Sequence, residues 1–200
     1  MLVPALVLSG GASSRMGSPK ALLRLGDRCF LSRVVGTLLE ADVPEVIVVT
    51  GAHHDAIAGE VDRWPAEWPV RLLRNDAPAT DQISSVRAGL TLIDRPGVAG
   101  VLIALVDHPL VTPATVVRLR EAFASGHSPV VRPRLGGRHG HPVIFGREAF
   151  DALREPSPDG AKTVLRRFAD RQRSVEVDDE GVLIDVDTPE DYERVRTRFT

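Results

Sequence analysis

The sequence predicts an α/β protein in which helices cover both faces of a mostly parallel central sheet, giving three layers. Short, continuously apolar runs rich in Val, Ile and Leu alternate with segments of helical periodicity. A strand that is apolar along its whole length is buried on both faces, and a helix between consecutive strands permits parallel pairing. The chain has 200 residues, 43% hydrophobic and 26% charged, which is ordinary for one globular domain. We therefore expect residues 1–200 to form a single domain.

The first half of the chain supplies most of this pattern. The segment EVIVVT at residues 45–50 is rich in β-branched residues and lies between Pro44 and Gly51, as is typical of a buried strand. Thr112 followed by Pro113 is a typical helix start, because a capping hydroxyl precedes a first-turn proline. We expect strands at residues 2–8, 45–50, 70–73 and 101–106, and helices at residues 30–39, 54–61, 85–93 and 112–123.

The second half is less regular. Trp64 and Trp68, each followed by proline, mark an irregular segment before it, where we expect the two rings to pack locally. Beyond residue 123 we expect a polar hairpin or loop between the first two of three strands, and a last helix that starts at Thr188. The expected strands are residues 130–131, 142–145 and 174–177, and the other expected helices are residues 148–153 and 161–168.

Composition excludes several classes of protein. The single cysteine, Cys29, cannot form an internal disulfide, and at a helix start it is best explained as a small buried hydrophobe. A formal net charge of −2 gives no electrostatic reason to expect a nucleic-acid or membrane partner. The apolar run at residues 101–106 is far too short to span a bilayer, and the first apolar run lacks the basic leader of a signal peptide. We expect a cytoplasmic protein.

A glycine-rich segment, LSGGASSRMGSPKALL at residues 8–23, follows the first expected strand. Glycines let backbone N–H groups approach a ligand closely, small hydroxyls add donors, and Arg15 and Lys20 supply positive charge. The segment is therefore a candidate phosphate cradle. Gly11 and Gly17 are separated by five residues rather than the four of a Walker A loop, and the adjacent Gly10 and Gly11 do not fit the dinucleotide fingerprint.

Two aspartate motifs are candidates for a metal site. Asp107, in LVDHPLVTP, comes just past the fourth expected strand, where a carboxylate can hold Mg²⁺ together with substrate phosphates, or can simply cap the turn before Pro109. His108 beside it is a poor Mg²⁺ ligand, so we expect it to act through shape or hydrogen bonding. Asp185 and Asp187 are two residues apart, and on an extended segment they would share a face. The residues after them form an ordinary helix start.

Two further segments are polar. The stretch from Asn75 to Leu90 runs into a helix that Ser84 or Ser85 can cap, and its first N–H groups suit an anionic or carbonyl ligand. Residues 132–147 contain four arginines, His139 and His141, but no acidic residue. This basic stretch can bind a phosphate, or it can be a solvated loop that balances the acidic residues 176–191.

Together these segments resemble the MobA-like nucleotidyltransferases, the family that includes molybdenum-cofactor cytidylyl- and guanylyltransferases. The likeness covers residues 6–192, and its most specific part is Gly-Gly followed by Arg-Met-Gly, two further residues and Lys20. It implies a Rossmann-like fold of the nucleotide-diphospho-sugar transferase type, with residues 1–106 binding the nucleotide and residues 107–200 the acceptor. Asp81-Gln82-Ile83 stands where many relatives have a glycine.

The resemblance also implies roles for individual residues. The metal cofactor would be Mg²⁺, held by Asp107 and Asp187, with Asp185 as a weaker candidate ligand. Catalysis would depend on Arg15, Lys20 and Asp107. The donor nucleoside triphosphate would contact Ser9, Gly10, Gly11, Ser13, Arg15, Lys20, Asn75, Ser84 and Ser85. The acceptor would contact His108, Arg138 and His141.

The substrates implied by the resemblance leave alternatives open. Gly10-Gly11 is similar to the guanylyl branch, whereas Ser18-Pro19-Lys20, Ser84-Ser85 and Gly140-His141-Pro142 are similar to the cytidylyl branch, so CTP is favoured over GTP. The implied acceptor is molybdopterin or its molybdenum form, and a molybdoenzyme would receive the product. The alternatives are transfer to a sugar or alcohol phosphate, and a non-catalytic chaperone that binds a molybdenum dinucleotide cofactor.

Overall fold

The computed structural model of the protein describes residues 1–10, 18–77, 82–126, 128–157 and 159–199. Its main sheet has the strand order β10-β7-β9-β6-β1-β4-β5, and β8 pairs with β7 outside this order. Along it, β9 is antiparallel to both neighbours and the other pairs are parallel, which confirms the expected mostly parallel sheet. The strands are Ala5–Ser9 (β1), Val46–Thr50 (β4), Val70–Arg74 (β5), Gly100–Leu105 (β6), Val130–Leu135 (β7), Arg138–His139 (β8), Val143–Gly146 (β9) and Gln172–Glu176 (β10).

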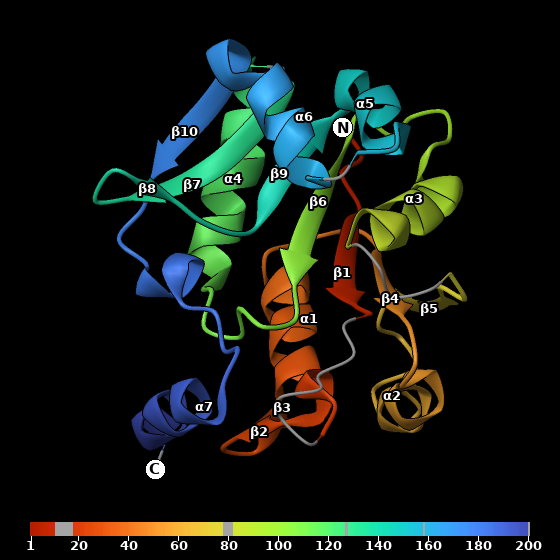
Figure 1. The fold of residues 1–200 in the computed structure, drawn as a ribbon, viewed down its shortest axis with the longest axis vertical. Coiled ribbons are helices and arrows are strands. Elements are labelled where there is room, and N and C mark those ends of the chain that lie inside the picture. The colour runs from red at the N-terminus through yellow and green to blue at the C-terminus, as the bar shows by residue number, and fades with distance from the viewer. Residues whose placement is uncertain (11–17, 78–81, 127, 158, 200) are drawn as a thin grey trace.

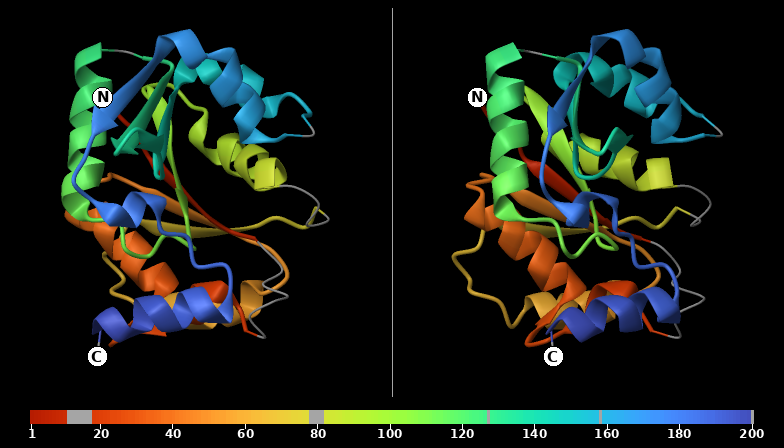
Figure 2. Two further views of the ribbon diagram at one scale, coloured as in Figure 1. Left: turned by 60° about the vertical axis from the view of Figure 1, so that its left-hand side comes forward. Right: turned by 90° about the vertical axis from the view of Figure 1, so that its left-hand side faces the viewer.

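Helices cover both faces of this sheet (Figures 1 and 2), with α1 and α4 on one face and α3, α5 and α6 on the other. Consecutive residues of β1 belong to different cores: Leu6 packs in the cluster that contains Leu90 of α3, and Val7 in the one that contains Val35 of α1. The strand is apolar throughout because both of its faces are buried. The helices are Phe30–Glu40 (α1), His54–Val61 (α2), Gln82–Ile93 (α3), Pro113–Gly126 (α4), Phe150–Arg154 (α5), Ala161–Arg167 (α6) and Pro189–Arg196 (α7).

Several boundaries differ from those expected. The first strand begins at Ala5 rather than at residue 2, because Pro4 has no N–H to donate, although Leu2 makes an isolated bridge to Val98. The strand expected at residues 130–131 continues to Leu135 and turns back into β8 through two glycines with positive φ. The helix expected at residues 148–153 is split into a 3-10 turn and α5.

Three local predictions hold. Cys29 is buried, and its sulfur also accepts a hydrogen bond from the Ser32 N–H at the start of α1. The rings of Trp64 and Trp68 lie 5.5 Å apart and pack against the core below β5. Thr188 opens α7 with a capping box. No helix in the described part of the chain is long and apolar enough to cross a membrane.

Candidate active site

Three charged side chains from distant parts of the sequence meet beyond the carboxyl ends of β1 and β6. Lys20 opens the 3-10 helix η1 (Lys20–Leu22), Asp107 follows β6, and Asp187 lies just before α7. The Lys20 ammonium donates a hydrogen bond to Asp187 Oδ1 and lies 4.0 Å from Asp107 Oδ2. The exposed fraction of the side chain rises from 17% for Lys20 to 26% for Asp107 and 50% for Asp187. The ammonium therefore links two carboxylates at the rim of the sheet.

Backbone contacts hold Asp187 in this place. The Val186 N–H donates to the carbonyl of Asp107 at 2.9 Å, which ties the segment before α7 directly to the loop after β6. The N–H of His141 donates to the Val182 carbonyl at 3.0 Å, and a Cβ on Gly140 would lie only 2.1 Å from that oxygen. Glycine at position 140 thus permits a backbone approach that any other residue would prevent.

A buried carboxylate that the sequence did not single out, Asp179, completes this attachment. Its Oδ2 accepts hydrogen bonds from the N–H and hydroxyl of Thr112, both at 2.9 Å, and from the Thr115 hydroxyl at 2.6 Å. The side chain thereby joins the start of α4 to the segment that carries Asp187. In the sequence Asp179 is one member of an acidic run, and nothing in that run distinguishes a buried carboxylate from an exposed one.

The electrostatics of Asp107 suit a cation. Burial raises the pKa of its carboxyl group, and repulsion from Asp187 acts in the same direction, whereas His108 and Lys20 oppose the rise. Its Oδ1 is buried and has no hydrogen-bond partner among the described residues. A buried carboxylate oxygen without a partner is suited to bind a cation such as Mg²⁺.

The donor set is sparse, as Mg²⁺ requires. Within the described ranges no cluster of three or more His, Cys, Asp or Glu side chains is arranged to hold a metal ion. Mg²⁺ is commonly held by one or two carboxylates and completes its shell with phosphate oxygens and water, so Asp107 and Asp187 fit it. The burial pattern fits the expectation that Asp185 and Asp187 share a face: Asp185 is exposed and Asp187 is half-buried, while Val186 between them is buried.

Residues expected at the nucleotide gather on the other side of β1. Asn75 follows β5, and its Nδ2 donates to the hydroxyls of Ser84 at 3.0 Å and Ser85 at 3.2 Å. A Cβ on Gly10 would lie 3.0 Å from the Ser85 hydroxyl, so the first glycine of the glycine-rich segment lies against the cluster of Asn75, Ser84 and Ser85. Ser9 is buried, and its hydroxyl has no partner among the described residues. Gly11, Ser13 and Arg15 lie outside the described residues.

The prediction that Ser84 or Ser85 caps its helix is wrong. The helix α3 begins earlier, at Gln82, so both serines lie within its first turn. Their hydroxyls serve instead as acceptors for the Asn75 amide, which joins the loop after β5 to the helix.

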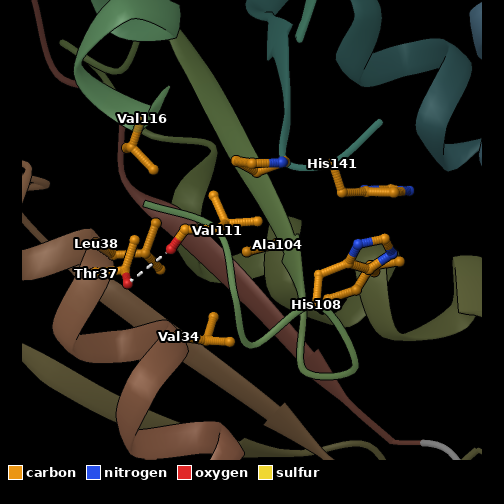
Figure 3. A pocket seen from close by; sticks show the side chains of 10 residues that line it. Val34, Thr37, Leu38, Ala104, His108, Val111, Val116 and His141 are labelled. Atoms are coloured by element: carbon orange, nitrogen blue, oxygen red, sulfur yellow. Dashed lines mark hydrogen bonds between the residues drawn. The ribbon is translucent and has the colours of Figure 1, made fainter. Parts of the chain in front are cut away.

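Two histidines lie close to Asp107. The rings of His108 and His141 are 5.1 Å apart, and in Figure 3 they lie together at one side of an apolar pocket. Burial, with the nearby His108 and Arg132, lowers the pKa of His141 to about 3. Its imidazole is therefore neutral at physiological pH. The pocket runs between α1 and the loop after β6 and is lined mainly by apolar side chains, among them Val34, Leu38, Ala104, Val111 and Val116.

The arginines of the basic stretch, residues 132–147, were expected either to bind a phosphate or to balance acidic residues, and the structure separates them. Arg134 pairs with Glu176 at 2.5 Å and Arg147 with Asp94 at 2.5 Å, so these two balance acidic residues. Arg138 is exposed on β8, and among the described residues it forms no hydrogen bond or ion pair with Lys20 or Asp107. Arg132 is half-buried instead. The sequence alone does not distinguish the four arginines, whereas their burial and their ion pairs in the structure do.

Comparisons with known proteins show the family of this chain. A family model for the MobA-like NTP transferase domain matches residues 5–176. The chain belongs to this family. Among its relatives is a molybdenum cofactor guanylyltransferase of Sinorhizobium fredii, 31% identical over 88% of this chain and 78% of the relative. Another relative is nicotine blue oxidoreductase of Paenarthrobacter nicotinovorans, 29% identical over 96% of each chain.

A solved structure shows the same architecture. A nucleotidyl transferase from Methanothermobacter, Mth528, superposes on this MobA-like chain with a TM-score of 0.79 and 29% identity, covering 99% of this chain and 97% of the other. The Rossmann-like nucleotidyltransferase fold expected from the sequence is confirmed.

The neutral His141 predicts a pH dependence of stability. In the unfolded chain an imidazole protonates below about pH 6.5, whereas in the fold the pKa of His141 lies at about 3. Unfolding therefore takes up a proton between these values, so this contribution is complete above pH 6.5 and is lost as the pH falls. Between pH 7.5 and 5 we expect the free energy of unfolding to drop by about 1 kcal/mol more in the wild type than in His141→Asn, allowing for partial exposure.

Urea denaturation of both proteins at the two pH values measures this difference. His53→Asn, at a histidine outside the site, is the matched control and should retain the wild-type drop. An equal drop in wild type and His141→Asn would show that His141 does not carry this pH dependence.

Proposed function

We propose that this chain is an Mg²⁺-dependent nucleotidyltransferase that moves a nucleoside monophosphate from a triphosphate to a phosphate monoester and releases pyrophosphate. The proposed acceptor is molybdopterin or its molybdenum form, and a molybdoenzyme would receive the product. The observation that carries this proposal is the meeting of Lys20, Asp107 and Asp187 beside the Asn75–Ser84–Ser85 cluster. An ammonium, two carboxylates and two hydroxyls are thereby gathered at the carboxyl ends of the parallel strands, where such sheets bind ligands.

The proposed reaction does not require a general base from the protein. A phosphate monoester has a second pKa of about 6 and is mostly dianionic at neutral pH, so it can attack the α-phosphorus without losing a proton to the protein. The bond from the α-phosphorus to the bridging oxygen then breaks, and pyrophosphate takes the electron pair. Mg²⁺, when bound, would neutralise phosphate charge. Lys20 would stabilise the triphosphate and the leaving group, so catalysis is mainly positioning and electrostatics.

In this proposal the first half of the chain binds the nucleotide and the second half binds the acceptor. Ser9, Gly10, Asn75, Ser84 and Ser85 would contact the donor nucleotide, with Gly11, Ser13 and Arg15 completing that set. His108 and His141 face the acceptor side of Asp107, where the neutral His141 can form hydrogen bonds without repelling a cation. Asp187 is favoured over Asp185 as second metal ligand, because Asp187 pairs with Lys20 beside Asp107 whereas Asp185 is exposed.

The identity of the donor is open to direct test. Ser84-Ser85 and Gly140-His141-Pro142 favour CTP, whereas Gly10-Gly11 and the guanylyltransferase relatives favour GTP. We expect pyrophosphate release from purified protein with Mg²⁺, molybdopterin and CTP, with each of the other three triphosphates assayed in parallel. Turnover with GTP alone would assign the protein to the guanylyl branch. Binding without pyrophosphate release would favour a cofactor chaperone, and turnover only with a sugar or alcohol phosphate would replace the acceptor.

An oxidoreductase is the second candidate, favoured by the nicotine blue oxidoreductase relative that matches 96% of this chain. It would transfer electrons to or from a redox cofactor and leave every triphosphate intact. A spectrophotometric assay with NADH, NADPH and nicotine blue, run beside the pyrophosphate assay, separates the two activities.

A further inference from the structure

Among the residues that the structure describes, Arg132 has no counter-ion, although its side chain is half-buried. It lies on β7, is half-buried, and forms no hydrogen bond or ion pair with any residue that the structure describes. Its Nε is fully shielded from solvent and has no acceptor there. An unsatisfied donor on a charged group removed from water destabilises a fold. Arg134, two residues along the same strand and on the same face, is exposed and paired with Glu176.

The surroundings of Arg132 connect it to the site. The Gly140 N–H donates to the Pro133 carbonyl at 3.1 Å, which brings the loop carrying His141 against β7 beside Arg132. From His141, the ring of His108 is 5.1 Å away, and Asp107 is the preceding residue. Arg132 is also close enough to His141 for its charge to help lower the pKa of that imidazole. If the phosphate of the acceptor reacts beside Asp107 and Lys20, Arg132 is available to contact a different part of the acceptor.

We propose that Arg132 is a specificity-determining residue for the acceptor and binds an anionic or carbonyl oxygen on the part of the acceptor remote from its reacting phosphate. This inference rests on the proposed function, because the position of the reacting phosphate is taken from it. A planar guanidinium presents paired donors, so it distinguishes an acceptor that carries such an oxygen from a plain alkyl phosphate. An oxygen of the acceptor would accept a hydrogen bond from the Arg132 Nε, which has no partner among the described residues.

The experiment compares Arg132→Met with the matched variant Arg134→Met, at the paired arginine on the same face. With molybdopterin as acceptor, we expect Arg132→Met to raise the KM for molybdopterin by at least about tenfold, the usual size of a lost charge-assisted hydrogen bond. We expect its kcat and its KM for the nucleotide to stay within about twofold of wild type. Arg132→Lys separates two kinds of oxygen: a single anionic oxygen would largely retain binding to lysine, and a bidentate carbonyl or carboxylate would not.

Two readouts do not depend on turnover. In the ligand-free protein, Arg132→Met should have a Tm about 2–4 °C above that of Arg134→Met, because methionine fills the same space without an unpaired charge. Orthophosphate, used as a simple anionic probe, should raise the Tm of wild type more than that of Arg132→Met. If molybdopterin gives no pyrophosphate, the proposed function fails while these two readouts still decide whether Arg132 is an anion-binding residue.

The inference would be overturned by an unchanged KM for molybdopterin in Arg132→Met, or by an equal increase in Arg134→Met. It would equally be overturned if Arg132→Met were less stable than Arg134→Met, or if orthophosphate stabilised wild type and Arg132→Met alike.

Discussion

Lys20→Ala is expected to lower kcat by about 10²–10³-fold at saturating nucleotide, the usual loss when a preorganised charge-stabilising donor is removed from a transition state. Lys20 is 17% exposed and is held between two carboxylates, so its ammonium is already placed at the edge where the leaving pyrophosphate would form. The structure thus gives the lysine a fixed position rather than a mobile one, which is what makes the loss large.

The control for this variant is provided by the sequence itself. The chain has two lysines, and Lys162, exposed on α6, is the other. Lys162→Ala should therefore retain wild-type kcat in the pyrophosphate assay. A second effect distinguishes the site from a general defect: without the ammonium between them, Asp107 and Asp187 should bind Mn²⁺ more tightly in the absence of nucleotide. Near-normal turnover of Lys20→Ala would remove Lys20 from the catalytic machinery.

Asp107→Asn should lower kcat/KM by at least about 10²-fold, because under the proposed function it removes a metal ligand and with it several kcal/mol of charge stabilisation. Asparagine keeps the shape and lacks the charge, and burial already raises the pKa of the Asp107 carboxyl, so the fold should tolerate the change. We expect an unchanged or slightly higher Tm together with weaker Mn²⁺ binding in isothermal titration calorimetry. A lower Tm with unaltered Mn²⁺ affinity would assign Asp107 a structural role instead.

The two aspartates near α7 provide the comparison for that experiment. Asp187→Asn should weaken Mn²⁺ binding as Asp107→Asn does, whereas Asp185→Asn, at an exposed carboxylate, should leave both metal affinity and turnover near wild type. The reverse order would make Asp185 the second ligand.

Local sequence determined much of the fold. The β-branched runs of β4 and β6 are short and apolar throughout, and a strand of this kind is stable only between two layers, so the three-layer arrangement follows from composition and periodicity alone. The start of α7 was equally clear, because the Thr188 capping box is a purely local set of hydrogen bonds. The glycine-rich segment ending at Lys20 was recognisable for the same reason, since its pattern is contiguous in sequence.

Only the tertiary structure decided which polar residues share a site. Asp107 and Asp187 come together because the Val186 N–H reaches the Asp107 carbonyl, and Asp179 fixes the same segment to the start of α4. Both contacts join residues far apart in the chain, and no local pattern announces them. The difference in burial and pairing between Arg132 and Arg134 has the same origin. The two residues lie on one face of the same strand, so they differ only in what packs over them. Sequence periodicity fixes which face a side chain points to, but burial and partners depend on the whole fold.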